Sequence, residues 1–412
     1  MHKAGRYTAA LLLISVGTAV IADKMTGGSW TSRLMEWWPV LFILLGMEYI
    51  VYNRKGGEQP IRLDVGGLIF SILISAVVVA GTQSFEFFRN WDHIQLGGSF
   101  GEDSDARRID QEPVRIPLSA DIQKLTVDNR LGSVKLQPGE GDEVIALLTV
   151  HVKDEDEEES QRIADASKLK YSAASGELVL KTAGMGEDGG LVWLGNKPRM
   201  DLTLTVPAQH ALNYELNLEN GSIEAGQLLL KEWMRGETTN GSVTLSELKG
   251  ELQLRTTNGR IQAEKTVGAL TLESTNGRID IKAHEGNAVL RTTNGKLSAD
   301  TVQGELEAET TNGTIEANGV RQGVKARTTN GTIQIATAEV GGDWNIQTSN
   351  GKIGLKLPSQ GDYRIEGVGK LGKVESALPL TVRDKTVSGT IGSGKYLLRA
   401  QTNGSLTLEE AH

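Results

Sequence analysis

The chain has 412 residues and carries 43 Lys and Arg against 52 Asp and Glu, a formal net charge of −9. This acidic balance argues against a nucleic-acid partner, which needs a basic face. Cysteine is absent, which excludes disulfide bonds, thiolate nucleophiles and metal sites built on cysteine. Glycine is abundant at 49 residues and proline scarce at 9, so turns with positive φ are expected and a proline-rich stalk is not.

Three apolar segments open the chain, at residues 8–22, 37–52 and 65–81. None contains Lys or Arg, and aromatic residues mark their ends, as in the headgroup belts of membrane proteins. With their flanks, the segments approach the roughly 20 residues that span a bilayer. We therefore predict three transmembrane helices in a membrane domain at 1–91. A cleaved signal peptide in the first segment and three core helices of a soluble domain are the alternatives.

The Lys and Arg residues near these segments predict their orientation. Five of them lie before the first segment or in the second loop, and three lie in the first loop or after the third segment. The positive-inside rule then places the N-terminus in the cytoplasm. The C-terminal part would lie outside the cytoplasm, anchored in the cell membrane.

Short motifs in the second segment carry a resemblance. Trp-Trp-Pro at 37–39, Leu-Leu-Gly at 44–46, the polar loop 53–62 and a third apolar segment follow one another. Over roughly 7–82 the chain resembles the LiaI/LiaF-type membrane region of bacterial envelope-stress proteins. The resemblance implies a role in envelope-stress sensing or signalling.

Residues 92–112 are polar and rich in Gly, Asp and Glu, which predicts a linker. From 113 to 210, short stretches alternate apolar and polar residues and predict an irregular β region that begins the solenoid. An acidic run at 154–159 predicts one short helix there, capped by Asp154 or Ser160, because acids stabilise a helix N-terminus. A Ca²⁺ loop is the alternative, but the run lacks the alternating ligands and the glycine of such a loop.

The part from 211 to 412 repeats the dipeptide Asn-Gly. Successive intervals between the first eight copies are 20, 18, 18, 18, 18, 18 and 20 residues, and such a fixed period indicates a repeat architecture. A ninth copy at Asn403 follows 53 residues after the eighth, which leaves room for degenerate rungs between them. The eight asparagines, which we predict to be structural corners, are Asn220, Asn240, Asn258, Asn276, Asn294, Asn312, Asn330 and Asn350.

Apolar and polar residues alternate on both sides of each Asn-Gly, which predicts two half-buried strands in each unit. Two folds fit this alternation. One is a meander of hairpins, for which Asn-Gly is a strong signal. The other is a parallel solenoid in which each unit is one rung.

The residue three positions before each asparagine distinguishes these folds. Its charge alternates in sign through Glu237, Arg255, Glu273, Arg291, Glu309 and Arg327. In a solenoid these side chains are neighbours about 4.8 Å apart, whereas in a meander they lie two strands apart. We therefore predict an all-β parallel β-solenoid with about 18 residues per rung and Asn-Gly corners, preceded by the three transmembrane helices. The charge ladder would fix its register.

We expect the glycine after each asparagine to adopt positive φ at its corner, where a side chain would cause strain. Stacked asparagine amides can bond along the axis, as they do in cross-β stacks. Both expectations follow from placing residues 18 apart on top of one another.

The repeat region also resembles a known family. The residues that carry the resemblance are the strand 202–207, Tyr-Glu-Leu at 214–216, and the Thr-Thr-Asn-Gly units up to Asn350. Over roughly 112–408 the chain is similar to the bacterial putative-adhesin family of β-strand-repeat domains. The resemblance implies a β-repeat fold and, by the family's label, adhesion.

The sequence shows no catalytic motif. No two of the six histidines have metal-ligand spacing, and there is neither a Gly-x-Ser-x-Gly elbow nor a phosphate-binding loop. We therefore predict a protein that is not an enzyme, with no catalytic residue, no cofactor and no metal ion. Outward carboxylates leave a carbohydrate-active β-helix enzyme as a further hypothesis, because glycoside hydrolysis needs a pair of them.

The leading functional hypothesis is a membrane-anchored extracytoplasmic solenoid that acts as a cell-envelope sensor, scaffold or interaction module, with a cell-wall or protein partner. The alternative is a surface adhesin that binds an external or cell-wall ligand. Self-assembly through the ends of the rod is a further hypothesis, because exposed strand edges can pair. The sequence leaves the ligand, the oligomeric state and the rung boundaries between 351 and 402 open.

Overall fold

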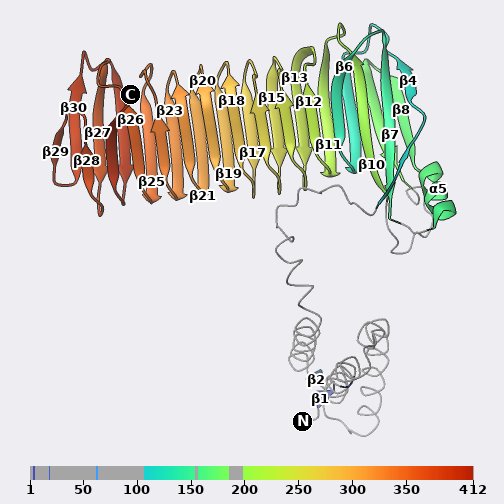
Figure 1. Cartoon of the computed structure of the whole chain (residues 1–412), viewed down its shortest axis with the longest axis horizontal. Coiled ribbons are helices and arrows are strands. Elements are labelled where there is room, and N and C mark those ends of the chain that lie inside the picture. The colour runs from blue at the N-terminus through green and yellow to red at the C-terminus, as the bar shows by residue number, and fades with distance from the viewer. Residues whose placement is uncertain are drawn as a thin grey trace. The chain divides into compact units, whose positions relative to one another are not determined.

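The structure, a computed structural model, describes residues 106–153, 156–184 and 198–411, together with Lys3–Ala4, Thr18 and Arg62–Leu63. The chain divides into two units, Met1–Gln95 and Leu96–His412. In the first unit, Lys3–Ala4 (β1) pairs in parallel with Arg62–Leu63 (β2). The second unit holds two sheets of 15 strands each, shown in Figure 1.

We call the two sheets sheet I and sheet II, and give their strands in spatial order. Sheet I runs β28 (Val374–Ser376), β32 (Leu406–Glu410), β26 (Ile353–Leu357), β24 (Ile333–Ala336), β22 (Ile315–Val320), β20 (Leu297–Val302), β18 (Ile279–His284), β16 (Ile261–Glu264), β14 (Val243–Ser246), β12 (Ile223–Gly226), β6 (Val134–Gly139), β10 (Arg199–Pro207), β7 (Glu143–Val152) and β3 (Arg107–Asp110), with β4 (Val114–Pro117) also paired to β7. Sheet II runs β29 (Thr381–Arg383), β30 (Thr386–Ile391), β27 (Tyr363–Gly369), β31 (Tyr396–Thr402), β25 (Trp344–Asn350), β23 (Val324–Asn330), β21 (Leu306–Asn312), β19 (Ala288–Asn294), β17 (Leu270–Ser274), β15 (Glu251–Thr256), β13 (Leu230–Thr238), β11 (Leu212–Asn220), β5 (Lys124–Leu131), β9 (Glu177–Ala183) and β8 (Lys168–Ala174).

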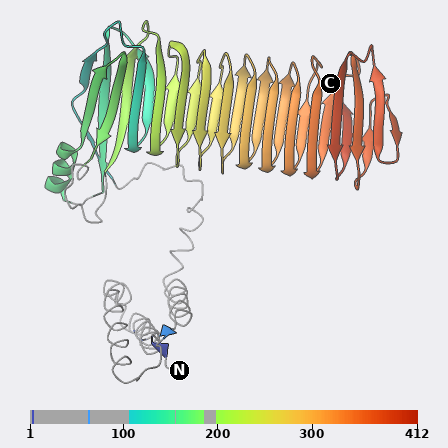
Figure 2. The same cartoon turned by 180° about the vertical axis from the view of Figure 1, so that it is seen from behind.

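Each rung of the repeat consists of one strand of sheet II, an Asn-Gly corner and one strand of sheet I. Strands of successive rungs pair in parallel, so that Leu252 of β15 lies opposite Leu270 of β17, and Ile261 of β16 lies opposite Ile279 of β18. Seen from both sides, the strands stand side by side along one axis (Figures 1 and 2). The unit is thus a parallel β-solenoid, as the period and the charge alternation predict.

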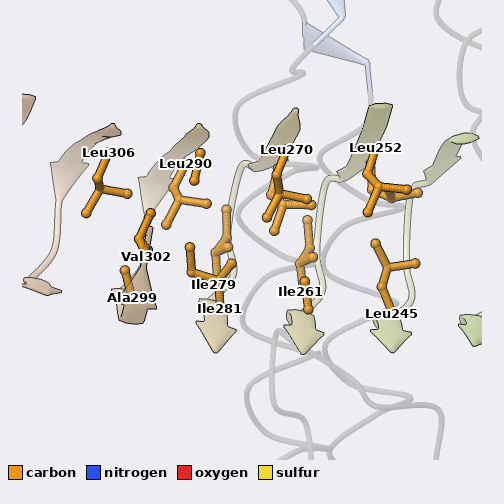
Figure 3. Packing of buried hydrophobic residues seen from close by; sticks show 14 of the residues in the cluster. Leu245, Leu252, Ile261, Leu270, Ile279, Ile281, Leu290, Ala299, Val302 and Leu306 are labelled. Atoms are coloured by element: carbon orange, nitrogen blue, oxygen red, sulfur yellow. The ribbon is translucent and has the colours of Figure 1, made fainter. Parts of the chain in front are cut away.

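The core is the layer between the two sheets. Leu252 and Leu254 of β15 face Ile261 and Ala263 of β16, and all four are at most 2% exposed. Equivalent residues of neighbouring rungs stack above and below them (Figure 3). Each rung therefore covers the apolar face of the next, and no rung has a core of its own.

In six successive rungs, the second corner returns the chain from sheet I to sheet II through a left-handed backbone conformation. The residues with this conformation recur at the rung period and are Gln227, Glu247, Lys265, Ala283, Thr301 and Gly319, with φ between 52° and 64°. All but the last carry a side chain, which costs about 1–2 kcal/mol in this conformation. The Asn-Gly glycines do not have it, so the expectation of positive φ at that corner is wrong.

Near its N-terminal end, the solenoid departs from chain order. The first rung in the sequence, β5 and β6, pairs on one side with β11 and β12 and on the other with β9 and β10. The later strands β9 and β10 are therefore the outer rung. Antiparallel strands cover it: β8 pairs with β9, and β7 pairs with β10.

At the C-terminal end, the order of the rungs along the axis also departs from chain order. The rung of β31 and β32, which contains Asn403, stacks directly on the rung of β25 and β26, which contains Asn350. The strands in between, β27 and β28, form the outer rung, and the hairpin β29–β30 covers β27. The 53-residue gap is therefore not filled by degenerate rungs lying between these two asparagines, because that segment folds beyond both of them.

The outermost strands give little opportunity for edge pairing. On sheet I they are β3 and the three-residue β28. On sheet II they are the three-residue β29 and β8, which carries Lys168 and Lys170. Short edges and lysines are features that hinder pairing with another chain.

One short helix, α5 (Glu157–Ala166), follows β7. Its N-cap is Asp156, whose side chain accepts a hydrogen bond from the backbone N–H of Glu158, and not Asp154 or Ser160 as expected. Ala164 of α5 packs in a small apolar cluster with Leu148 and Met200. The acidic run therefore stabilises the start of a helix that covers one end of sheet I.

The predicted fold class needs correction in its helical part. In the part of the chain that the structure describes, no helix is long and apolar enough to cross a membrane. The segments 8–22, 37–52 and 65–81 lie, except for Thr18, outside the described residues. The prediction of three transmembrane helices preceding the solenoid is therefore not supported.

Candidate functional site

The eight predicted corner asparagines form one continuous ladder along the solenoid. The side-chain amide Nδ2 of each asparagine donates to the Oδ1 of the asparagine one rung earlier, at 2.7–2.9 Å. The seven bonds join Asn240 to Asn220 and so on up to Asn350 to Asn330. All point the same way, so the amide dipoles add and the bonds polarise one another.

The ladder has a defined end at each side. At the N-terminal side, Asn220 lies opposite Leu131 in the register of β11 and β5. At the C-terminal side, Thr402 lies opposite Thr348, and Asn403 follows Thr402 directly, whereas Ser349 intervenes before Asn350. The corner of the Asn403 rung is thus one residue shorter, which takes Asn403 out of line with the ladder.

The glycines of these corners are required by close approach between rungs. A Cβ atom built on Gly295 would lie 2.0 Å from the carbonyl oxygen of Gly277 in the preceding rung. The same contact would be 1.7–1.9 Å at the other Asn-Gly corners from Gly221 to Gly404. No side chain fits there, so the glycine allows the asparagine ladder to close.

A column of buried hydroxyl groups lies under the same corner. The side-chain oxygen of Thr292 donates to the carbonyl oxygen of Gly277 at 3.1 Å, and Thr292 is 6% exposed. The equivalent donors to a glycine carbonyl are Thr238, Thr256, Ser274, Thr310, Thr328, Thr348 and Thr402. These hydroxyls were not among the predicted site residues, although a Thr or Ser stands two residues before each corner asparagine from Asn240 to Asn350.

The six residues of the charge ladder lie on the outer face of sheet II, in successive rungs. Glu237 is opposite Arg255, and the register continues through Glu273, Arg291, Glu309 and Arg327. Their guanidinium and carboxylate groups approach to 3.6–3.9 Å in four ion pairs.

A second row, two residues earlier in each strand, strengthens the ladder at its centre. Glu307 accepts a 2.7 Å hydrogen bond from Arg291 and lies 3.0 Å from the Lys325 ammonium group. The hydrogen bond from Lys325, followed by that from Arg291, lowers the pKa of Glu307, although partial burial opposes the shift. Glu307 is therefore ionised at neutral pH.

A surface trough lies on sheet II, between the charge ladder and the Asn-Gly corners. One wall is the charge ladder from Arg255 onward, continued by Gln347 and Gln401. The other wall is the row of residues two positions later in each rung, namely Thr275, Thr293, Thr311, Thr329, Ser349 and Asn403. The trough has a volume of about 760 Å³. Its walls cross seven rungs, and the six spacings between them, at about 4.8 Å each, give a length of about 29 Å.

The chemistry of the trough is uniformly polar. All of its lining residues are Arg, Lys, Glu, Gln, Asn, Ser or Thr. It holds four cations, Arg255, Arg291, Arg327 and Lys370, against the carboxylates of Glu273 and Glu309. In the described ranges no group of three or more His, Asp or Glu could hold a metal ion. The trough therefore offers hydrogen-bonding groups on every rung and, over its whole length, an excess of cations over carboxylates.

Comparison with known proteins identifies a family. A family model described as Toastrack DUF4097 matches residues 96–303 and 283–408. The matched residues include the whole repeat region and the trough, which supports the resemblance to an adhesin-like β-repeat family. They exclude 7–82, so the resemblance of that segment to LiaI/LiaF-type regions is not shown.

Several solved structures are similar to this chain at low identity. A putative adhesin from Parabacteroides distasonis is 16% identical, with 61% of this chain and 98% of that chain covered and a TM-score of 0.42. A putative adhesin from Parabacteroides merdae is 13% identical, with coverage of 61% and 96% and a TM-score of 0.40. A putative lipid binding protein from P. distasonis is 11% identical, with coverage of 74% and 97% and a TM-score of 0.34. No curated protein matches the chain.

Proposed function

This chain belongs to the Toastrack DUF4097 family, and we propose that its β-solenoid is a surface interaction module of the adhesin type. It holds an extended partner along the trough and catalyses no reaction. The observation that carries this proposal is the continuity of the trough over seven rungs, each of which contributes polar or charged side chains. A partner that runs along the axis would meet polar side chains at every step of about 4.8 Å and an arginine at every second step from Arg255 to Arg327.

The rigidity of the trough supports binding. From the Asn220 rung to the Asn350 rung, each rung is tied to the next at this edge by an Asn–Asn bond and by a buried hydroxyl that donates to a glycine carbonyl, such as those of Asn294 and Thr292. A surface fixed in this way loses little conformational entropy when a partner binds. The repeated Asn and Thr residues at these corners thus serve binding as well as stability.

The electrostatics of Glu307, beside the trough, do not suit the general acid of glycoside hydrolysis. That reaction needs a general acid whose pKa is raised, so that the carboxyl group can protonate the leaving oxygen. Glu307 beside the trough has a lowered pKa, because Lys325 and Arg291 bond to it. A carboxylate held ionised in this way can bind and orient a partner but cannot donate a proton at neutral pH.

The binding proposal is tested with the full chain and isolated bacterial cell-envelope material in a cosedimentation assay. Thr293→Met combined with Thr329→Met fills the trough without changing charge, and binding should fall several-fold. Thr244→Met combined with Thr407→Met places the same side chains on the outer face of sheet I and should leave binding unchanged. Equal binding by the two double variants would show that the trough is not the binding surface.

We further propose that the solenoid lies outside the cytoplasm and serves the cell envelope as a sensor or scaffold. The absence of cysteine and a binding surface without catalytic groups are compatible with such a place. Protease added to intact cells should then cleave the solenoid, and removal of residues 211–412 should alter an envelope-stress reporter. Full protection from the protease would contradict the location, and an unaltered reporter would contradict the sensor role.

A further inference from the structure

The trough lies on the face of sheet II, and this position restricts what can bind there. The backbone N–H and C=O groups of β15 to β25 pair between rungs, so a peptide cannot add to them as a strand. Many peptides that bind by side chains use aromatic or aliphatic anchors in apolar pockets. Because every lining residue is polar or charged, the trough offers no such pocket.

The hydroxyl wall favours a partner that is itself rich in hydroxyl groups. Thr275, Thr293, Thr311, Thr329 and Ser349 place one hydroxyl on each of five successive rungs. A hydroxyl donates one hydrogen bond and accepts others, so it suits sugar hydroxyls in either orientation. The trough has no aromatic platform on which bases could stack, and the chain carries a net charge of −9, so nucleic acid is disfavoured.

The opposite wall, formed by the charge ladder, favours a ligand that carries negative charge. Arg255, Arg291 and Arg327 recur at every second rung, which is about 9.6 Å. Arg255 and Arg327 approach glutamates of the ladder only to 3.9 Å, beyond hydrogen-bond range. Their guanidinium N–H groups are therefore positioned to form bidentate bonds with a carboxylate of a ligand. The excess of cations over carboxylates in the trough also favours an anionic ligand.

We propose that the trough binds a linear polysaccharide that carries carboxylate groups and lies along the solenoid axis. This inference rests on the proposed function and adds the class of partner. Sugar hydroxyls bond to the Thr and Ser row, and ligand carboxylates pair with the arginines of the charge ladder. Each rung contributes a weak contact, and affinity comes from the number of rungs engaged.

The experiment measures binding of a size series of oligogalacturonates to the full chain by calorimetry, with neutral galactan oligomers as counterparts. Affinity for the acidic series should increase with length until the ligand fills the trough and should decrease with added salt. The neutral series should bind at least about tenfold more weakly, because the charge-assisted bonds are lost. Equal binding of both series would overturn the proposal.

Two matched variants locate the binding. Arg255→Gln with Arg327→Gln should weaken binding of long oligogalacturonates roughly tenfold or more. Lys282→Gln with Lys356→Gln removes the same charge from the exposed face of sheet I and should change affinity less than about twofold, because exposed charges far from the ligand are screened. Equal losses in both variants would mean general charge attraction and would refute the site.

The outcome also separates this inference from the proposed function. If the trough-filled variant loses binding to envelope material while no oligogalacturonate binds, the module has a partner of another class and the polysaccharide proposal is wrong. If filling the trough changes neither kind of binding, both proposals are wrong.

Discussion

Replacing Gly295 by alanine tests the reason for the Asn-Gly repeat. The added Cβ would lie 2.0 Å from the carbonyl oxygen of Gly277, 2.8 Å from its carbon and 3.0 Å from the Thr292 hydroxyl. Ordinary contacts of a Cβ atom are 3.4–4 Å, so the two rungs must separate by about 1 Å or more at this corner.

The expected loss in the free energy of unfolding follows from the hydrogen bonds that such a separation breaks. The bond between the side chains of Asn294 and Asn276 is 2.9 Å long, and that from Thr292 to Gly277 is 3.1 Å. The backbone N–H of Asn294 also donates to Thr275 at 2.8 Å. Losing two or three such bonds, at about 0.5–1.5 kcal/mol each, should lower the free energy of unfolding by about 2–3 kcal/mol.

Urea denaturation followed by circular dichroism measures this loss. Gly354→Ala is the matched control, because its Cβ would meet nothing closer than 3.9 Å, from the side chain of Gln334. The control should differ from the unmodified chain by no more than about 0.5 kcal/mol. Unfolding of both variants at the same urea concentration would refute the argument that close approach requires glycine here.

Three further predictions concern other columns of the repeat. Asn294→Asp places two acceptors against each other in the ladder and should cost about 1 kcal/mol at neutral pH. The loss, measured as a Tm difference from the unmodified chain, should shrink in acid, where the protonated carboxyl can donate. Thr301→Gly relieves a left-handed backbone and should raise the free energy of unfolding by up to about 1 kcal/mol, whereas Gly319→Thr, at the same corner of the next rung, should lower it. Burial lowers the pKa of His284, so the folded state favours the neutral ring. The resulting stabilisation is present above the ordinary histidine pKa of 6.5 and is lost as the pH falls below that value. His284→Val, which copies Val302 of the next rung, should therefore reduce the Tm difference between pH 7 and pH 5, and an unchanged difference would contradict this role.

The regular part of the solenoid could be predicted because its signals are local and repeated. The 18-residue period fixes which residues stack, and the alternating sign at Arg255, Glu273 and Arg291 is explained only if they are neighbours. The apolar alternation fixes which side chains face the core. These signals depend on spacing alone, which a single sequence displays directly.

The ends of the rod could not be predicted, because spacing does not reveal strand order. The gap between Asn350 and Asn403 is close to three periods, so it suggested rungs between them. In the structure those strands pair with β31 and β32 from the outer side. Only long-range pairing energies distinguish the two arrangements, and these have no periodic signature.

The site was predicted in part. The charge ladder and the asparagine column were identified by residue, whereas the trough between them was not. The trough depends on the second threonine of each Thr-Thr-Asn-Gly unit facing outward while the first, such as Thr292, turns inward to Gly277. The inward hydroxyl is satisfied by a carbonyl of another rung, and that partner is visible only once the rungs are stacked.

The exchanged order of the terminal rungs has a mechanical consequence. The last strand of the chain, β32, is held by β26 on one side and by β28 on the other. A pulling force on β32 must break its pairing with two neighbours, whereas a force on an edge strand breaks the pairing with one. Two rows of backbone hydrogen bonds therefore resist a force on β32 at the same time. The force should be shared between the rungs on both sides of β32 before either of them separates.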